Sequence, residues 1–376
     1  VDADGKPLEA VRVGAAIGSA GGGSGVTDSV ATTGQDGRFV LSMTKRESKD
    51  PLQLSLVITK DGYASFDSST IDLPAKASAV VDVGQFTLRS GCGIPVRTVD
   101  EAGNPLPGAV VEPLGEYAQR RQAIRTNAQG LGMLRNLPAG VVSVRAEYGT
   151  LSHQSKIVVD EASIASEPIT LHLKELNPQP AQEITFPDPP PVGSAAPELQ
   201  VVAWTDGQAR TLADCRGKVV VLEFWGVWCS ACLNGLPARK EIEAKYAGRS
   251  DIVFLGIHSA GTDLAQIKRL QQLKDWKLVT GLDQGEDTVD GVIAQAYGAR
   301  GWPTTVIIDR EGKIAYNSNL QKWDSLTILR EQARVTKALN LPPEKPGASF
   351  EDRVARSNVR NAFRLSELID AALEQK

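Results

Sequence analysis

The chain has 376 residues, of which 41% are hydrophobic and 23% charged, so it has the composition of a globular protein long enough for two or three domains. Its formal net charge is −4 and no block of lysine or arginine stands out, which argues against nucleic acid or an acidic membrane surface as a partner. No apolar run has the length of a transmembrane helix and no signal peptide is visible, so we expect any export signal or anchor to be absent from this chain.

An internal repeat opens the chain. Residues 1–8, VDADGKPL, recur as residues 99–106, VDEAGNPL, and each copy is followed by a short valine-rich run. Each copy also has a second turn signal further on, GQDGRF at 34–39 and NAQGLG at 127–132. This spacing predicts a duplicated unit of roughly 90 residues.

Both copies of the repeat are predicted to be all-β. Short alternating segments such as Leu52–Thr59 and Val141–Ala146 are punctuated by Gly, Asn and Asp, which predicts two small β-sandwiches at residues 1–90 and 91–176. The repeats resemble carboxypeptidase-regulatory-like domains, and that resemblance implies a transthyretin-like or immunoglobulin-like sandwich. It says little about function. We expect spacers or docking modules, and attachment to the cell envelope is one role open to them.

The second half of the chain is predicted to be α/β. Residues 177–197 contain the run PDPPP at 187–191, which predicts a semi-rigid linker, because proline fixes φ and lacks a backbone donor. Strands and helices then alternate over 198–341, with a closing helix at 324–338, and this order predicts a sheet covered on both faces. Residues 342–376 are predicted to form a helical extension whose apolar stripe packs on a neighbouring surface.

The sequence places two cysteines at the start of a helix. Val219–Trp225 is predicted to be a buried strand, and a helix is predicted from Cys229 to Tyr246. Free amides and the positive end of the helix dipole favour a thiolate at Cys229, and Cys232 follows one turn later. We therefore interpret Cys229 as a nucleophile and Cys232 as the thiol that resolves the mixed disulfide. The other cysteines and histidines are not paired at ligand spacing, so no metal site is expected.

Three further motifs accompany this pair. They are VGSAAPE at 192–198, LADCRGK at 212–218 and WPT at 302–304, and the cysteines themselves lie in WCSAC at 228–232. With these motifs the C-terminal half resembles the TlpA-like extracytoplasmic thioredoxin-fold proteins of the redoxin family. The resemblance implies a thioredoxin fold, thiol–disulfide exchange, and a periplasmic or otherwise extracytoplasmic location.

Two tryptophans and a proline are expected beside the sulfurs. By the family resemblance, the peptide bond before Pro303 is cis and faces the redox pair, and a Trp-Pro bond is one where the cis form costs little. Trp228 and Trp302 are expected to flank the sulfurs, either as docking surfaces for a partner or as simple core packing. The dipeptide Ser230-Ala231 lacks the proline common in reducing members of the family, so the direction of the reaction stays open.

Glu223 is a candidate acid–base residue. It interrupts an apolar strand six residues before Cys229, and it matches the buried acid of thioredoxins position for position. A carboxyl group buried there has a raised pKa and is placed to exchange the proton of Cys232. An exposed glutamate at the edge of the sheet is the alternative.

The remaining cysteines and one histidine are expected to be structural. Cys92 opens the second repeat and Cys215 precedes the central strand, where a small half-buried side chain fits. A bridge between the two stays open, because geometry decides it. His258 ends a predicted buried strand, and we expect it to have a hydrogen-bonded structural role.

Taken together, the sequence predicts a thiol–disulfide oxidoreductase without metal or organic cofactor. Its Cys229–Cys232 pair is expected to exchange with protein thiols and disulfides and with an upstream redox donor or acceptor. A thiol peroxidase is one alternative, because the region 196–225 is similar to peroxiredoxins, but Gly226 stands where that chemistry needs Thr or Ser. A non-catalytic cell-envelope adaptor is the other alternative.

Overall fold

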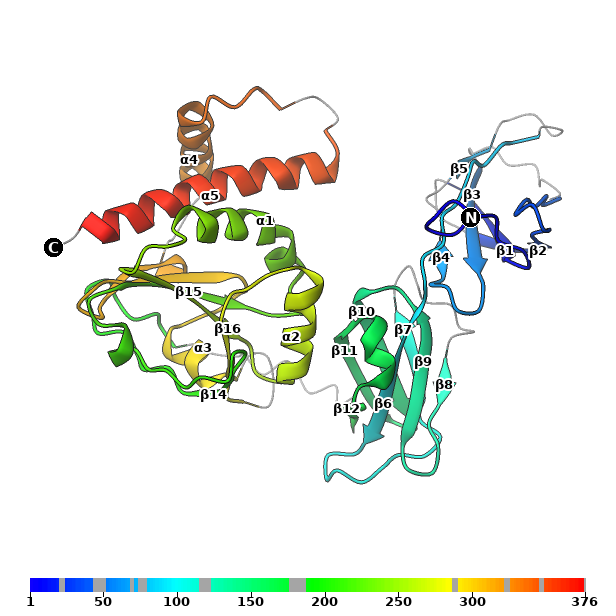
Figure 1. The fold of residues 1–376 in the computed structure, drawn as a ribbon, viewed down its shortest axis with the longest axis horizontal. Coiled ribbons are helices and arrows are strands. Elements are labelled where there is room, and N and C mark those ends of the chain that lie inside the picture. The colour runs from blue at the N-terminus through cyan, green and yellow to red at the C-terminus, as the bar shows by residue number, and fades with distance from the viewer. Residues whose placement is uncertain are drawn as a thin grey trace. The chain divides into compact units, whose positions relative to one another are not determined.

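The computed structural model describes residues 1–19, 24–42, 52–67, 71–73, 80–114, 123–175, 187–285, 290–320, 325–344 and 348–374. The chain divides into two compact units, Val1–Pro178 and Gln179–Lys376 (Figure 1). Over the described ranges, no helix is both long enough and apolar enough to cross a membrane.

The first half of the N-terminal unit is built on one antiparallel sheet. Its strands follow the order β2-β1-β3-β4, and β5 also pairs with β3. Along β3 the alternate residues Leu54, Leu56 and Ile58 are buried, as expected for a strand with one face on a core. The strands are β1 (Arg12–Ser19), β2 (Ser24–Thr32), β3 (Leu52–Thr59), β4 (Phe66–Asp67) and β5 (Ile71–Asp72).

The second half of this unit has two sheets that share one core. One sheet has the order β13-β11-β10-β7-β8 and the other β12-β6-β9. Ile94 of β6 and Val144 of β10 belong to the same buried cluster. The N-terminal part is therefore β-rich, as predicted, and its assignment to a particular sandwich family stays a prediction. The strands are β6 (Cys92–Val99), β7 (Val110–Leu114), β8 (Ile124–Arg125), β9 (Leu131–Leu137), β10 (Gly140–Tyr148), β11 (Leu151–Val159), β12 (Ile169–His172) and β13 (Lys174–Glu175), with a 3-10 helix at Glu161–Ala165.

The sequence repeat is also a repeat of backbone conformation. Asp2 and Asp100 each accept a hydrogen bond on Oδ1 from the backbone N–H four residues later, in both cases at 2.8 Å. Gly5 and Gly103 have φ angles of 81° and 84°, in the left-handed region that glycine favours. The shared V-D-x-x-G-x-P-L pattern therefore encodes one turn used twice.

The C-terminal unit is built on a six-stranded mixed sheet in the order β14-β17-β16-β15-β18-β19. The central strand β15 pairs in parallel with β16 and antiparallel with β18. The strands are β14 (Val201–Trp204), β15 (Val219–Trp225), β16 (Ile252–His258), β17 (Thr280–Asp283), β18 (Thr304–Ile308) and β19 (Ile314–Asn317). The helices are α1 (Ser230–Lys245), α2 (Leu264–Leu273), α3 (Val292–Ala296), α4 (Ser325–Ala338) and α5 (Phe350–Glu374), with 3-10 helices at Ala213–Cys215 and Ser318–Leu320.

Alternation along β15 divides its side chains between two cores. Val220 and Leu222 belong to a buried cluster that includes residues of α3, whereas Val219 and Val221 belong to a cluster that includes residues of α1 and α5. Successive side chains of a strand point to opposite faces, so Glu223 points to the same face as Val219 and Val221. The alternation of side chains along β15 thus directs the Glu223 carboxyl group toward α1, the helix that carries the cysteines.

Helix α5 forms part of the core on the α1 side of the sheet (Figure 1). Its residues Ala362, Ile369 and Ala372 are buried in the cluster that also contains Val219 and Val221. The segment predicted as an extension therefore packs against the sheet, and the predicted domain boundary at residue 341 stays a prediction.

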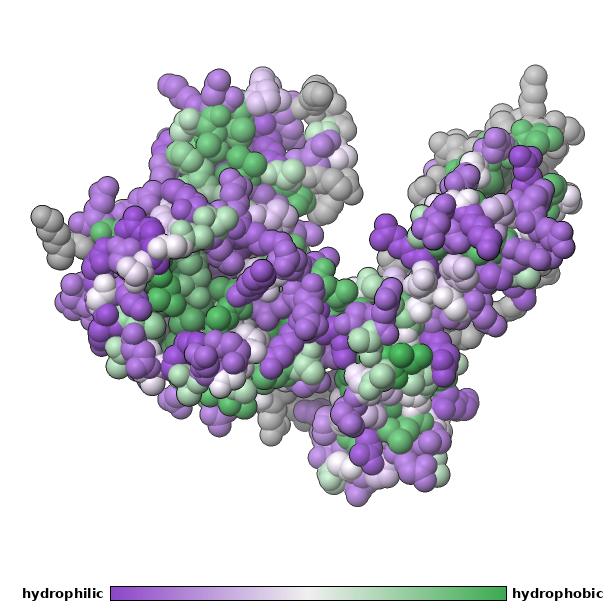
Figure 2. Space-filling model, in the orientation of Figure 1, coloured by the Kyte–Doolittle hydropathy of each residue, from purple (hydrophilic) through white to green (hydrophobic). Residues whose placement is uncertain are grey.

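Helix α4 packs on α5. Arg334 of α4 forms an ion pair at 2.7 Å with Glu367 of α5. Ile328 and Leu329 of α4 remain 40% and 61% exposed. Figure 2 shows a hydrophobic patch over this helix. The helix that closes the sheet face beside α1 is thus the last one in the chain, and α4 forms an outer layer.

Part of the predicted linker is bonded to the C-terminal unit. Residues 176–186 lie outside the described residues, but Gly193 N–H donates to Ile314 O at 2.8 Å, and Ile314 N–H donates to Ser194 O at the same distance. The hydroxyl of Tyr297 donates to Pro197 O at 2.6 Å. The end of the proline-rich stretch therefore lies against β19 and the segment after α3.

Candidate active site

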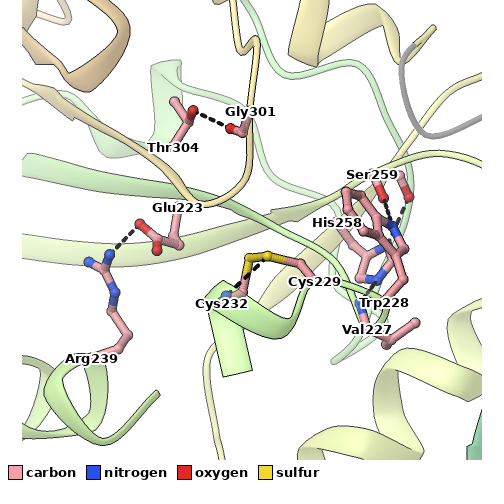
Figure 3. Close-up of a disulfide and its surroundings, with 10 residues drawn as sticks. All are labelled: Glu223, Val227, Trp228, Cys229, Cys232, Arg239, His258, Ser259, Gly301 and Thr304. Atoms are coloured by element: carbon pink, nitrogen blue, oxygen red, sulfur yellow. Dashed lines mark hydrogen bonds and ion pairs between the residues drawn. A yellow bond between two sulfur atoms is a disulfide. The ribbon is translucent and has the colours of Figure 1, made fainter. Parts of the chain in front are cut away.

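The two predicted redox cysteines are joined by a disulfide at the start of α1 (Figure 3). Cys229 is the N-cap of the helix, and the backbone N–H of Cys232 donates to Cys229 Sγ at 3.0 Å. In the disulfide, Cys229 is 4% exposed and Cys232 is partly exposed. The N-cap position gives the Cys229 sulfur a hydrogen-bond donor and the positive end of the helix dipole, and both favour a thiolate over a thiol.

The loop before the cysteines is held by the end of β16. The backbone N–H of Val227 donates to His258 Nε2 at 2.8 Å, and Trp228 Nε1 donates to Ser259 Oγ at 2.9 Å (Figure 3). The rings of Trp225 and His258 meet edge to face, with centroids 4.9 Å apart. These contacts confirm the hydrogen-bonded role expected of His258, and they add Ser259, which the sequence had not singled out.

The hydrogen bonds of His258 fix it in one neutral form. Its Nδ1 lies 2.8 Å from Ser259 O, a pure acceptor, so Nδ1 carries the proton and Nε2 accepts from Val227. Burial of the ring lowers the pKa of His258 to about 4, and the hydrogen bond to Ser259 acts in the opposite direction. The imidazole is therefore an uncharged acceptor at neutral pH.

Because His258 is buried and uncharged, we expect the C-terminal unit to be less stable at acidic pH. Its pKa is about 4 when folded and near 6.5 when unfolded, so the unfolded chain binds a proton first as the pH falls. We expect His258 to lower the free energy of unfolding by roughly 3 kcal/mol between pH 7 and pH 4. Urea unfolding followed by tryptophan fluorescence reports this unit alone, because all six tryptophans lie between Trp204 and Trp323. His258→Asn should remove that part of the pH dependence, and an unchanged dependence would contradict the assignment.

The proline predicted to face the redox pair follows a cis peptide bond. The Trp302–Pro303 bond is cis, and Pro303 lines a cavity that Cys232 also lines. The rings of Trp228 and Trp302 meet edge to face with centroids 5.4 Å apart. The buried Nε1 of Trp302 has no hydrogen-bond partner within the described part of the chain. A docking role for the two tryptophans stays a prediction.

Glu223 is buried, with 6% of its surface exposed, so the alternative of an exposed edge position is wrong. The hydroxyl of Thr305 donates to Glu223 Oε2 at 2.7 Å. Burial raises the pKa of Glu223 above its ordinary value, and the Arg239 guanidinium and the Thr305 hydroxyl act against that increase. The acid expected from the sequence is therefore a buried carboxyl group with specific partners.

Arg239 is a site residue that the sequence reasoning missed. It forms an ion pair with Glu223 (Figure 3), and its Nη2 also lies 3.1 Å from Thr305 Oγ1. The helical spacing could have identified Arg239, because a residue seven positions after Cys232 lies on the same face of the helix as that cysteine. A carboxylate buried by strand alternation also requires a nearby cation or a proton.

The similarity of this chain to known proteins lies in its C-terminal unit. Residues 191–330 match the family model described as Redoxin. The C-terminal part of this chain is a redoxin domain with a thioredoxin-like fold. The protein named thiol-disulfide oxidoreductase ResA from Bacillus thuringiensis subsp. konkukian (strain 97-27) is 32% identical to it over 123 residues, which cover 33% of this chain and 66% of that protein. The thioredoxin-like protein YneN of Bacillus subtilis (strain 168) is 28% identical over 122 residues, covering 32% of this chain and 68% of that protein.

One solved structure similar to the redoxin domain is described as a putative protein disulfide isomerase from Bacteroides thetaiotaomicron. It is 31% identical, the alignment covers 38% of this chain and 88% of that chain, and the TM-score is 0.31. The chain spans 66% of the length of the ResA protein described above. The match to the family model ends at residue 330, within α4. Helix α5 lies beyond the matched residues.

The other cysteines of the chain are free and buried. Cys215 of the redoxin domain is 7% exposed and Cys92 of the N-terminal unit is 4% exposed. Burial is the main cause that raises the thiol pKa of each. A raised pKa lowers the thiolate fraction, so neither cysteine has the environment of a reactive one.

Proposed function

We propose that this protein is a thiol–disulfide oxidoreductase that exchanges its Cys229–Cys232 pair with protein partners outside the cytoplasm. The observation that carries the proposal is the disulfide across the first turn of α1, in which the Cys229 sulfur accepts the N–H of Cys232 at the helix start. The names of the curated relatives, which describe thiol-disulfide oxidoreductases, support the same activity.

In the reducing direction, the Cys229 thiolate attacks a partner disulfide. One partner sulfur leaves as a thiolate, and a mixed disulfide joins Cys229 to the other. Cys232 then loses its proton and attacks Cys229 Sγ, which releases the second partner thiol and restores the internal disulfide. Two electrons pass from the dithiol to the partner, and the oxidising direction is the reverse of these steps.

Glu223 exchanges the proton of Cys232 in this scheme. Its burial and its place on the α1 face of β15 support the role. Pro303, Trp228 and Trp302 form the docking surface for the partner chain, and this proposal is supported by the cavity that Pro303 shares with Cys232 and by the contact between the two tryptophan rings. The reaction needs no metal and no organic cofactor, because the sulfurs carry the electrons.

The two N-terminal β-rich modules act as spacers or attach the protein to the cell envelope. The support is the resemblance of their sequence repeat to carboxypeptidase-regulatory-like domains.

The extracytoplasmic location is tested by labelling Cys229 in intact cells with a membrane-impermeant thiol reagent after mild reduction. Labelling only after lysis would contradict an extracytoplasmic site.

The activity is tested by measuring reduction of a protein disulfide such as that of insulin, together with the potential of the Cys229–Cys232 couple. A potential of about −270 mV would indicate a reductant, and one of about −120 mV an oxidant. A folded protein whose disulfide neither reduces with dithiothreitol nor exchanges with a protein substrate would contradict the proposal.

A further inference from the structure

Glu223 and Arg239 form a buried ion pair near the redox disulfide (Figure 3). Their side chains are 8% and 12% exposed, so solvent screens the pair little. Thr305 bridges them, since its hydroxyl donates to Glu223 Oε2 at 2.7 Å and its oxygen accepts from Arg239 Nη2 at 3.1 Å. The guanidinium of Arg239 and the hydroxyl of Thr305 thus hold one carboxylate oxygen, Glu223 Oε2, in a fixed position.

The pair faces a cavity shared with the resolving cysteine. This cavity has a volume of about 210 Å³ and is lined by Glu223, Arg239, Cys232 and Pro303, with Asn358 and Asn361 contributed by α5. It has room for several water molecules. The buried Nη1 of Arg239 has no hydrogen-bond partner over the described part of the chain, so a donor remains available beside the carboxylate.

Two opposing effects set the charge of Glu223. Burial favours the neutral acid, whereas the guanidinium of Arg239 and the hydroxyl of Thr305 favour the carboxylate. The other titratable or charged groups around the pair are Glu243 on α1, Tyr316 on β19 and Arg364 on α5. Of the two groups that favour the carboxylate, only Arg239 carries a positive charge.

We propose that Arg239 is a positioning residue for the second half of the exchange, which keeps Glu223 ionised and aimed at the cavity so that it can accept the proton of Cys232. This inference rests on the proposed thiol–disulfide exchange. In the step, the S–H bond of Cys232 breaks and its proton passes to the Glu223 carboxylate. The Cys232 thiolate then forms a bond to Cys229 Sγ, and the partner sulfur leaves with the electron pair of the mixed disulfide. The carboxyl group later returns the proton to solvent or to the departing thiolate.

Arg239→Met tests this role in the full chain. Reduced protein is mixed with dithiobis(nitrobenzoate), and stopped-flow absorbance separates two releases of nitrothiobenzoate. The first release reports the attack by Cys229 and should keep the wild-type rate. The second reports the attack by Cys232 and should slow roughly 100-fold at pH 7, since a neutral Glu223 cannot act as a base. The difference should shrink as the pH rises and Cys232 ionises by itself, whereas a structural fault would slow the step at every pH.

Matched variants distinguish charge from folding. Arg239→Lys retains a cation and should recover part of the second rate, even where the methionine variant folds poorly. Glu223→Gln should slow the same step, and adding Arg239→Met to it should cause little further loss, because both act through one group. Arg249→Met removes an arginine from the exposed ion pair with Asp251 and should leave both rates unchanged.

The outcomes separate this inference from the proposed function. If the wild-type protein gives no second release, thiol–disulfide exchange itself fails. If it gives both releases and Arg239→Met has the wild-type second rate at pH 7, the role of Arg239 is wrong and the proposed function stands. Infrared difference spectra provide a further check. The variant should show a protonated carboxyl band that Glu223→Gln abolishes, and absence of that band would also contradict the inference.

Discussion

Cys229→Ser is expected to lower the rate of protein disulfide reduction by about 1,000-fold or more, because the chain loses its only sulfur at a helix N-cap among the described residues. A serine hydroxyl at that position remains protonated at neutral pH and cannot attack a disulfide. The measurement is turnover of a fluorescent insulin disulfide with dithiothreitol as the electron source. Cys215→Ala, which removes a buried free thiol of the same domain, should keep the wild-type rate.

Cys232→Ala should give a different defect from Cys229→Ser. The first attack remains, but the mixed disulfide cannot be resolved, so a covalent complex with the partner accumulates. Mass spectrometry after non-reducing electrophoresis would identify that complex and its linkage through Cys229. If complexes form through Cys232 in the Cys229→Ser variant instead, the assigned order of the two sulfurs is wrong.

Ile369→Ala is expected to reduce the free energy of unfolding of the redoxin domain by about 3 kcal/mol, because the side chain is fully buried between α5 and the sheet. Its removal leaves a cavity in the core that the central strand shares with α1. Tryptophan fluorescence in urea measures this change. Val359→Ala on the same helix is the matched control, since Val359 is 41% exposed and should change stability by less than about 0.5 kcal/mol.

The Ile369 prediction also tests where the domain ends. If Ile369→Ala leaves the unfolding midpoint unchanged, α5 is a loosely attached extension. A loss of stability would show that the domain requires a helix beyond the residues matched by the family model.

Local rules were enough to locate the redox centre. The spacing of Cys229 and Cys232 after a buried strand indicated a helix start, and the structure places Cys229 at the N-cap of α1. The burial of β15 was also predictable, since the apolar residues on both sides of Glu223 indicated a strand buried on both faces. The cis bond before Pro303 followed from the family resemblance. The helix start and the buried strand depend on residues close together in the chain, where periodicity and capping preferences act directly.

The partners of these residues depended on the tertiary structure. His258 accepts a hydrogen bond from Val227, 31 residues away, and Tyr246 bonds to Asp370, 124 residues away. The pairing of Glu223 with Arg239 required the strand and the helix to meet in one register. The helix at 324–338 was predicted to close the domain, but α5 is the helix whose residues enter the core beside α1. Both α4 and α5 have an apolar stripe, so the stripe itself does not distinguish them. An apolar stripe shows that a helix packs against something, but which surface it covers depends on shape and on burial summed over the whole core.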